Sequence, residues 1–195
     1  MALAAIGAAP VRAGLILSVQ NVSDSSPSTG DQLEVYLMNS GAPVTVDAFT
    51  FGLSMTDPNY TFTSVTTSTT PDIYIFAGNS VFGPTISTTA TVDSAIASDL
   101  WGGAGNGFTV GTGVTVGLGE VSFDIAPNAA PATVSFVANQ TSLSDINGSP
   151  FSIDSENSGT IAIVPEPSSV ALFGSALILL VLRRRKHRSA PEIAL

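Results

Sequence analysis

The stretch Phe49-Thr50-Phe51-Gly52-Leu53-Ser54-Met55 places a large apolar side chain at every second position. Successive side chains of a β-strand point to opposite faces of the sheet, so this period of two predicts a strand with one buried face. An amphipathic helix would instead repeat its apolar positions every three or four residues. The stretch therefore predicts a half-buried strand, and the rest of the chain can be compared with it.

The same alternation recurs on both sides of this stretch, in residues 33–37, 121–125 and 134–136, and residues 15–19 and 159–164 supply a first and a last strand. Turn sequences such as Asp57-Pro58-Asn59 and Asn147-Gly148 separate these segments. About eight or nine short strands at this spacing predict an all-β fold, an antiparallel β-sandwich. Residues 73–119 are rich in glycine and predict a long loop region between strands.

The composition restricts the chemistry. The chain has 195 residues, 44% of them hydrophobic, which suits one domain of about 150 residues plus signal segments. It contains no cysteine, which excludes disulfides, thiolate nucleophiles and zinc–thiolate sites. No Lys, Arg or His occurs from residue 14 to residue 182, whereas all acidic residues except Glu166 and Glu192 lie within residues 14–164. Such a domain repels polyphosphates, so nucleic-acid binding is excluded.

Catalysis has few residues available in this region. Without His, Cys, Lys or Arg, neither triads nor Schiff-base chemistry can be assembled. Glu120 and Asp124 would lie about 13 Å apart along a strand, too far for a glycosidase pair. Asp154 and Glu156 would lie about 7 Å apart, within that range, but they also fit solvated acids at the end of a strand. We therefore expect a protein that is not an enzyme.

A calcium loop is the one cofactor site that the sequence offers. Asp145-Ile146-Asn147-Gly148 presents oxygen ligands at alternate positions, from Asp145 and Asn147. The stretch lacks the third acidic position and the distal glutamate of a calcium loop. An Asn-Gly turn explains the same residues without a metal ion.

Three aromatic residues are candidates for ligand binding. Trp101, Tyr60 and Tyr74 can offer flat faces to sugar rings, and Trp101 stands beside Gly102-Gly103. The alternative for Trp101 is that its ring closes one end of the sandwich.

The C-terminal stretch consists of three consecutive segments: an extended segment with two prolines, an apolar segment and a basic cluster. Val164-Pro165-Glu166-Pro167 is held extended by its prolines, and residues 168–182 carry no charge and no polar face. A basic cluster follows, formed by Arg183, Arg184, Arg185, Lys186 and Arg188. An apolar helix that ends in cations predicts a single transmembrane helix with a stop-transfer signal, and the positive-inside rule places its basic end in the cytoplasm. The alternative is a buried C-terminal helix of a globular domain.

This ordered triplet resembles the PEP-CTERM sorting signal of Gram-negative bacteria. The resemblance implies that Pro165, Glu166 and Pro167 are the motif processed by exosortase, a membrane enzyme similar to a transpeptidase. It also implies delivery to the cell surface or the exopolysaccharide matrix. At the other end of the chain, residues 1–13 contain the apolar run 2–9 and predict the remnant of a secretory signal peptide.

The strand order carries a second resemblance. Thr29-Gly30-Asp31 and Val46-Asp47-Ala48-Phe49-Thr50-Phe51 resemble the opening of cohesin domains. Leu118-Gly119-Glu120-Val121-Ser122-Phe123 and Leu143-Ser144-Asp145-Ile146-Asn147-Gly148 resemble their closing strands. The resemblance implies a jelly-roll sandwich related to cohesins and carbohydrate-binding modules.

The expected organisation is a signal-peptide remnant (1–13), an exported β-sandwich (14–164), a PEP-CTERM signal (165–188) with its transmembrane helix at 168–182, and a cytoplasmic tail (189–195). The expected function is a structural or adhesive role at the cell surface or in the polysaccharide matrix, with exosortase and extracellular polysaccharide as partners. A cohesin-like module that binds a carbohydrate or a protein is the alternative. A carboxylate-dependent hydrolase is the weakest hypothesis.

Overall fold

The computed structural model describes residues 14–87 and 94–164, and in this part of the chain every regular element is a strand. The strands are β1 (Leu15–Val19), β2 (Val22–Asp24), β3 (Ser28–Asn39), β4 (Val44–Val46), β5 (Ala48–Met55), β6 (Tyr60–Thr66), β7 (Thr85–Ser87), β8 (Ser94–Leu100), β9 (Phe108–Val110), β10 (Val114–Ile125), β11 (Ala132–Phe136), β12 (Ser142–Ser144), β13 (Ile153–Asn157) and β14 (Gly159–Ile163). The predicted all-β class is confirmed, with more strands than the eight or nine expected.

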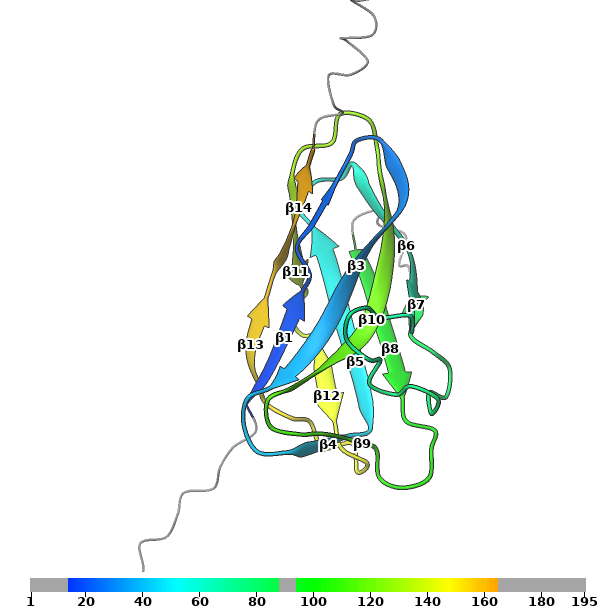
Figure 1. The fold of residues 1–195 in the computed structure, drawn as a ribbon, viewed down its shortest axis with the longest axis vertical. Helices are drawn as coiled ribbons and strands as arrows, with labels where there is room; N and C mark the ends of the chain where they lie inside the picture. Colours follow the sequence, from blue (N-terminus) through cyan, green and yellow to red (C-terminus); the bar gives the residue numbers. More distant parts are fainter. Residues whose placement is uncertain (1–13, 88–93, 165–195) are drawn as a thin grey trace, which may run out of the picture. The chain divides into compact units, whose positions relative to one another are not determined.

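Two sheets face each other across the core (Figure 1). The five-stranded sheet has the order β13-β1-β3-β10-β6, and the seven-stranded sheet has the order β2-β14-β11-β5-β8-β7 with β12 also paired to β5. Strands β11 and β12 share one edge of β5, because β11 pairs with its C-terminal half and β12 with its N-terminal half. A short pair, β4 and β9, closes one end.

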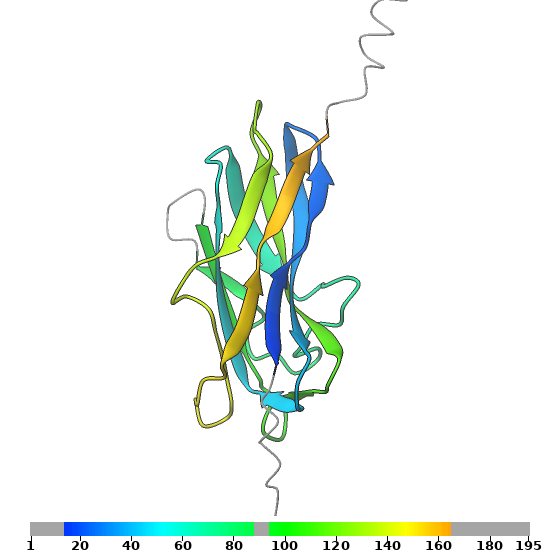
Figure 2. The same ribbon diagram turned by 90° about the vertical axis from the view of Figure 1, so that its left-hand side faces the viewer.

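The first and last strands each pass from one sheet to the other. The chain leaves β1 in the five-stranded sheet for β2 in the seven-stranded sheet, and β13 and β14 make the same change. Both contacts between these strands are parallel, β1 with β13 and β14 with β2, and Figure 2 shows the two segments running side by side. The expected antiparallel sandwich is confirmed, and these two parallel contacts at the first and last strands add to it. The beginning of β1 and the end of β14 lie at opposite ends of the domain (Figure 1).

The core follows the alternation in the sequence. Leu33, Val35 and Leu37 of β3 are buried, and they face a row of buried side chains from β5 that consists of Phe49, Phe51, Leu53 and Met55. Burial of such side chains stabilises the domain by about 1.5–3 kcal/mol each. With no cation within residues 14–164, apolar burial and hydrogen bonds hold this fold together without ion pairs.

The glycine-rich region is more ordered than its composition suggests. Residues 73–119 were expected to form a long loop, but they contain β7, β8, β9 and the first half of β10. The glycines of β10 permit close packing: a Cβ added at Gly117 would lie 2.4 Å from Cβ of Thr69, and one at Gly119 would lie 2.8 Å from Cγ2 of Val65. They therefore mark a close approach of the chain to the sheet, and the loop prediction is wrong here.

Residues 1–13, 88–93 and 165–195 lie outside the described part of the chain. The predicted signal-peptide remnant, transmembrane helix, basic cluster and cytoplasmic tail all fall in these ranges and stay predictions. Between residues 14 and 164, excluding 88–93, the structure contains no helix long and apolar enough to cross a membrane.

Candidate binding surface

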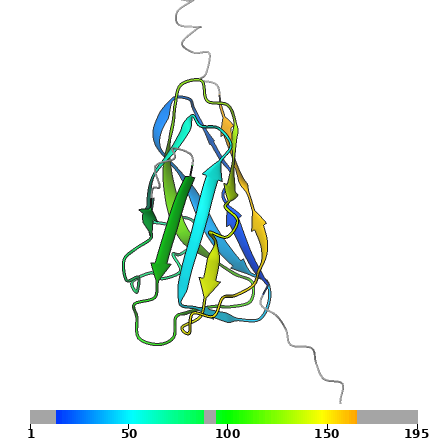
Figure 3. The same ribbon diagram turned by 180° about the vertical axis from the view of Figure 1, so that it is seen from behind.

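The outer side of the seven-stranded sheet is turned towards the viewer in Figure 3. Strands β5 and β12 carry no charged residue, and Asp99, the one acid of β8, is buried, while Asp47 and Asp145 adjoin the ends of β5 and β12. Register pairs Ala48 with Leu100 and Thr50 with Ser98, and we call these four residues the β5–β8 face. Further along β5 the face is covered, because a Cβ added at Gly52 would lie 2.7 Å from Gln140. The five-stranded sheet differs, since its strands carry the acidic residues Asp31, Glu34, Glu120, Asp124, Asp154 and Glu156.

A buried carboxylate fixes the segment that borders this face. Asp99 in β8 is 4% exposed, and its Oδ2 accepts hydrogen bonds from the hydroxyls of Tyr74 and Ser80, each at 2.5 Å. Its Oδ1 accepts the backbone amide of Leu100 at 2.8 Å and that of Phe82 at 3.5 Å. Burial, then the hydrogen bond to Asp99, raises the pKa of the Tyr74 hydroxyl far above its usual value, so this hydroxyl stays a donor. Asp99 therefore anchors residues 74–82 to the sheet.

The anchored segment presents an apolar edge to solvent. The Phe82 side chain is 73% exposed, and Leu100, across a shared hollow of about 270 Å³, is 38% exposed. The walls of this hollow are Ala48, Phe49, Thr50, Phe82, Ser98, Asp99 and Leu100. A face of uncharged outward side chains, with an exposed aromatic side chain at its edge, is typical of a surface that binds another protein.

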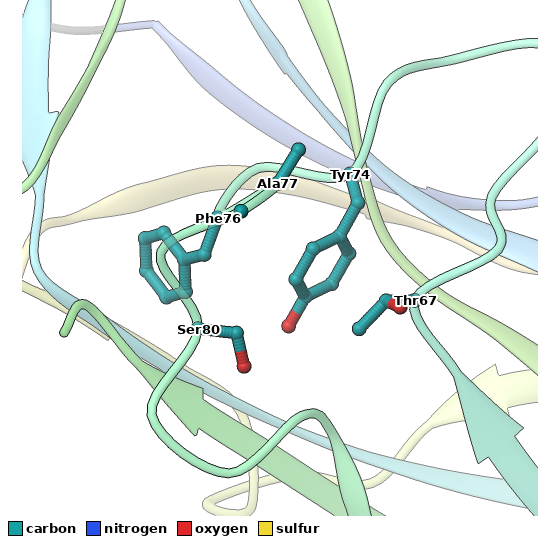
Figure 4. Close-up of a pocket in the computed structure, with 6 residues that line it drawn as sticks. Thr67, Tyr74, Phe76, Ala77 and Ser80 are labelled. Carbon is teal, nitrogen blue, oxygen red and sulfur yellow. The ribbon is translucent and has the colours of Figure 1, made fainter. Parts of the chain in front are cut away.

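A second hollow, of about 290 Å³, is lined mainly by the anchored segment itself (Figure 4). It is lined by Thr67, Tyr74, Phe76, Ala77, Gly78 and Ser80. The Tyr74 and Ser80 hydroxyls point into one region in this view, but both donate to Asp99. Two of the hydroxyls that line the hollow, those of Tyr74 and Ser80, therefore already donate to Asp99, and no basic residue exists within residues 14–164 to activate a hydroxyl.

The three predicted ligand-binding aromatics do not form a strip on the surface. Tyr60 is 0% exposed, packs against Phe123, and donates its hydroxyl to the carbonyl of Ala130 at 2.6 Å. Tyr74 is 4% exposed. The expectation that these two tyrosines offer flat faces to a ligand is therefore wrong, because both rings belong to the core.

Trp101 is half-buried and lies edge-on to Phe76, with ring centroids 6.0 Å apart. Its backbone amide donates to the carbonyl of Asp47 at 2.7 Å, and a Cβ added at Gly103 would lie 2.6 Å from the indole ring. The indole ring therefore packs between Phe76 and Gly103, just after the end of β8. This placement agrees with a ring that closes the end of the sandwich, and sugar binding by Trp101 stays a prediction.

The predicted calcium loop is a tight turn. Oδ1 of Asp145 accepts the backbone amides of Asn147 at 2.9 Å and Ser149 at 2.8 Å, and Gly148 has φ of +73°. The amides of Ser149 and Asn147 lower the pKa of the Asp145 carboxyl. In the described residues, no group of three or more His, Cys, Asp or Glu side chains could hold a metal ion. Calcium binding at Asp145 and Asn147 stays a prediction.

The carboxylates that the sequence offered for catalysis, none of which was predicted to be catalytic, lie on the five-stranded sheet. On β10, Glu120 accepts a hydrogen bond from Nε2 of Gln32 at 2.9 Å, and Asp124 accepts one from the amide of Gly30 at 2.8 Å. Asp154 and Glu156 are exposed on β13, the edge strand of this sheet. Neither pair lines one of the two hollows described above.

Sequence reasoning missed Phe82, Asp99 and Leu100. They lie in the region expected to be a loop, where β8 alternates small residues and gives a weak hydrophobic signal. One signal was present: Asp99 stands at an inward position of the strand, after the buried Ala95 and Ala97. When an acidic residue occupies an inward-facing position of a strand, its carboxylate is expected to have hydrogen-bond partners inside the domain.

Comparison with known proteins gives two results for this chain. A family model described as the PEP-CTERM protein-sorting motif matches residues 164–186. This match confirms the resemblance of the tail, including Pro165, Glu166 and Pro167. A search of curated proteins finds no match.

The domain is similar to solved cohesin structures. The Clostridium acetobutylicum cohesin CaCohA2, in complex with CaDoc0917, is 17% identical with a TM-score of 0.57, covering 77% of this chain and 99% of the cohesin. A non-cellulosomal cohesin from the archaeon Archaeoglobus fulgidus is 13% identical with a TM-score of 0.56, covering 81% and 96%. The third cohesin of Acetivibrio cellulolyticus ScaC, in complex with the ScaB dockerin, is 14% identical with a TM-score of 0.57, covering 77% and 99%. The predicted cohesin-like β-sandwich is confirmed.

Proposed function

We propose that this chain is an exported protein whose cohesin-like domain binds another protein at the cell surface. The observation that carries the proposal is the β5–β8 face, an uncharged surface beside the exposed Phe82. Similar solved structures include cohesins in complex with dockerins, which supports a protein as the partner. The partner class that we propose is therefore a small dockerin-like module with an apolar contact surface.

The sorting part of the proposal comes from the tail. A PEP-CTERM motif at residues 164–186 supports export, retention by an apolar segment and processing by an exosortase. Strand β14 ends at Ile163, so the motif begins directly after the folded domain. We propose that processing leaves this domain at the surface with its binding face intact.

This reading favours a binding module over the structural or adhesive role expected from the sequence. An exposed phenylalanine, held at the edge of a face of uncharged side chains by the hydrogen bonds of Asp99, favours a surface that contacts a partner. The proposal includes no catalysis, and extracellular polysaccharide is not needed as a partner.

Binding can be tested by isothermal titration calorimetry with purified dockerin modules, beginning with the dockerins of the similar complexes. We expect at least one module to bind with a Kd in the micromolar range or below. Leu100→Asp should weaken that binding at least tenfold, because it places a charge in the apolar centre of the contact, a loss of about 1.4 kcal/mol or more.

The matched control is Val114→Asp, because Val114 is 39% exposed and Leu100 is 38% exposed, but Val114 lies in β10 of the other sheet. We expect this variant to bind as the wild type does. Equal weakening by both variants would exclude the β5–β8 face. If a broad panel of modules, tested with the folded wild-type chain, gave no binding at all, the protein-binding proposal would be wrong.

A further inference from the structure

Residues 67–73 cross the outer face of the five-stranded sheet between two fixed points. They follow β6 and precede Tyr74 and Ile75, which are buried at 4% and 1% exposure. Thr67, Ser68, Thr70, Pro71 and Ile73 are exposed, and the segment contains no strand. We call this segment the lid.

One backbone hydrogen bond joins the lid to the sheet, from the amide of Gly117 to the carbonyl of Ile73 at 2.9 Å. The backbone of Asp72 also lies near the carboxyl of Glu34, where it lowers the pKa of that carboxyl by less than burial raises it. The next bond along the chain, from the amide of Ile75 to the carbonyl of Gly117 at 2.8 Å, belongs to the buried anchor. The lid therefore depends on few contacts, and one of them is made to an ionisable group.

Two polar oxygens are buried beneath the lid without a partner, Oε1 of Glu34 and Oγ1 of Thr69. The alternation in β3 places Glu34 on the outward face, where solvent would be expected, yet this residue is only 3% exposed. A buried carboxylate with an unsatisfied oxygen is costly when it is ionised. The lid contributes to this cost, because it helps to keep water away from the Glu34 carboxylate.

The groups that face Glu34 increase this cost. From β10 the facing group is Glu120, its direct partner in register, and from the lid it is Asp72. From β1 and its continuation it is the uncharged Gln20, whose Oε1 accepts the backbone amide of Glu34 at 3.0 Å. Tyr36 follows on the same face of β3, and no Lys, Arg or His exists in residues 14–164 to neutralise the three carboxyls.

We propose that residues 67–73 form a proton-controlled lid, closed over the sheet when Glu34 is protonated and open when Glu34 is ionised beside Asp72 and Glu120. Opening lets water reach the Glu34 carboxylate and separates it from Asp72. The inference goes beyond the proposed function and needs no partner protein.

The protonation equilibrium gives the direction of the effect. Burial, and then the charges of Asp72 and Glu120, raise the pKa of Glu34 from 4.5 to about 7. The closed state thus holds its proton to higher pH than the open state does. Closure is favoured below about pH 4.5, weakens as the pH rises towards 7, and is constant above that value.

The lid can be tested by amide hydrogen exchange, followed by NMR on the full-length chain in detergent, with rates expressed as protection factors at pH 5 and pH 8. The probe is the Gly117 amide, which bonds to the lid, and the internal reference is the Ile75 amide, which bonds to the anchor. We expect the Gly117 protection factor to fall at least about tenfold at pH 8, since one pKa unit corresponds to a factor of ten. Protection of Ile75 should not change.

Glu34→Gln should keep the Gly117 amide protected at pH 8, because the side chain then has no charge to bury. Asp72→Asn is a second variant on the exposed lid and should give an intermediate loss, while the exposed control Glu156→Gln should behave as the wild type does. A Gly117 protection factor that is equal at both pH values would overturn the proposal. The same holds if Glu34→Gln loses protection as the wild type does, or if Ile75 loses protection together with Gly117.

Discussion

At the scale of single residues, Asp99 joins the core of the domain to its proposed binding edge. One carboxylate oxygen holds two hydroxyls, and the other receives amides from residues on both sides of the hollow. A buried acid without a cation is stable only when hydrogen bonds replace its hydration. Asp99 meets this condition, and it holds Phe82 where solvent can reach the ring.

We expect Asp99→Ala to lower the free energy of unfolding by about 2–4 kcal/mol, because it leaves the buried Tyr74 hydroxyl without an acceptor. Tyr74→Phe should cost less, about 1.5–3 kcal/mol, since it removes one hydrogen bond to a charged group. Urea unfolding of both variants and of the double variant would measure the coupling between them.

The exposed control for this series is Glu156→Ala, which should change the unfolding free energy by no more than about 0.5 kcal/mol. If Asp99→Ala has an effect as small as this control, the carboxylate does not anchor the segment. Strict additivity in the double variant would likewise contradict the hydrogen bond between Tyr74 and Asp99.

At the scale of elements, the turn after β12 is either a calcium-binding loop or a purely structural turn, and these two hypotheses predict different responses to Ca²⁺. The Asp145 carboxylate already accepts two amides of its own turn. We therefore expect millimolar Ca²⁺ and Mg²⁺, at constant ionic strength, to shift the melting temperature equally, through general screening of the acidic domain. Differential scanning fluorimetry measures this shift.

A true calcium site would respond differently, because Mg²⁺ dehydrates reluctantly and a specific ligand stabilises only the folded state. A shift that Ca²⁺ alone produces, and that Asp145→Ala abolishes, would show that Asp145 and Asn147 bind calcium. The turn would then have two roles.

The predictability of each strand depended on the size of its side chains. The alternation of β3, β5 and the second half of β10 was visible because large apolar residues mark the buried face. Strand β8 was missed, since its buried row begins with Ala95 and Ala97. Glycine was interpreted as a sign of loop structure, whereas Gly117 and Gly119 in β10 make room for segments that pack against them.

The candidate sites were less predictable than the strands, because they depend on contacts between distant parts of the chain. Tyr74 and Asp99 are 25 residues apart, and nothing local indicates that their side chains meet. Glu34 occupies an outward position that any pattern assigns to solvent, yet in the folded domain it is buried. Local periodicity determines towards which face of the sheet a side chain points, and tertiary contacts determine what covers that face.

At the scale of the whole molecule, export and topology can be tested with fusions. We expect alkaline phosphatase to be active when fused after Val164 and inactive when fused after Arg188, because the enzyme folds only outside the cytoplasm and the basic cluster is retained inside. Activity of the second fusion would contradict the proposed orientation of residues 168–182. The matched control is expression of both fusions at equal levels, verified by immunoblot.

The pairing of the chain's two ends has a mechanical consequence. Strands β1 and β13 run parallel, as do β14 and β2, and the strand ends lead away from opposite ends of the domain. A pull applied between the two termini therefore acts along the paired strands and loads their hydrogen bonds together, in shear. Had these strands been antiparallel with their ends adjacent, the same pull would have separated the bonds one at a time. A domain with this connectivity is suited to bearing tension applied between its two ends.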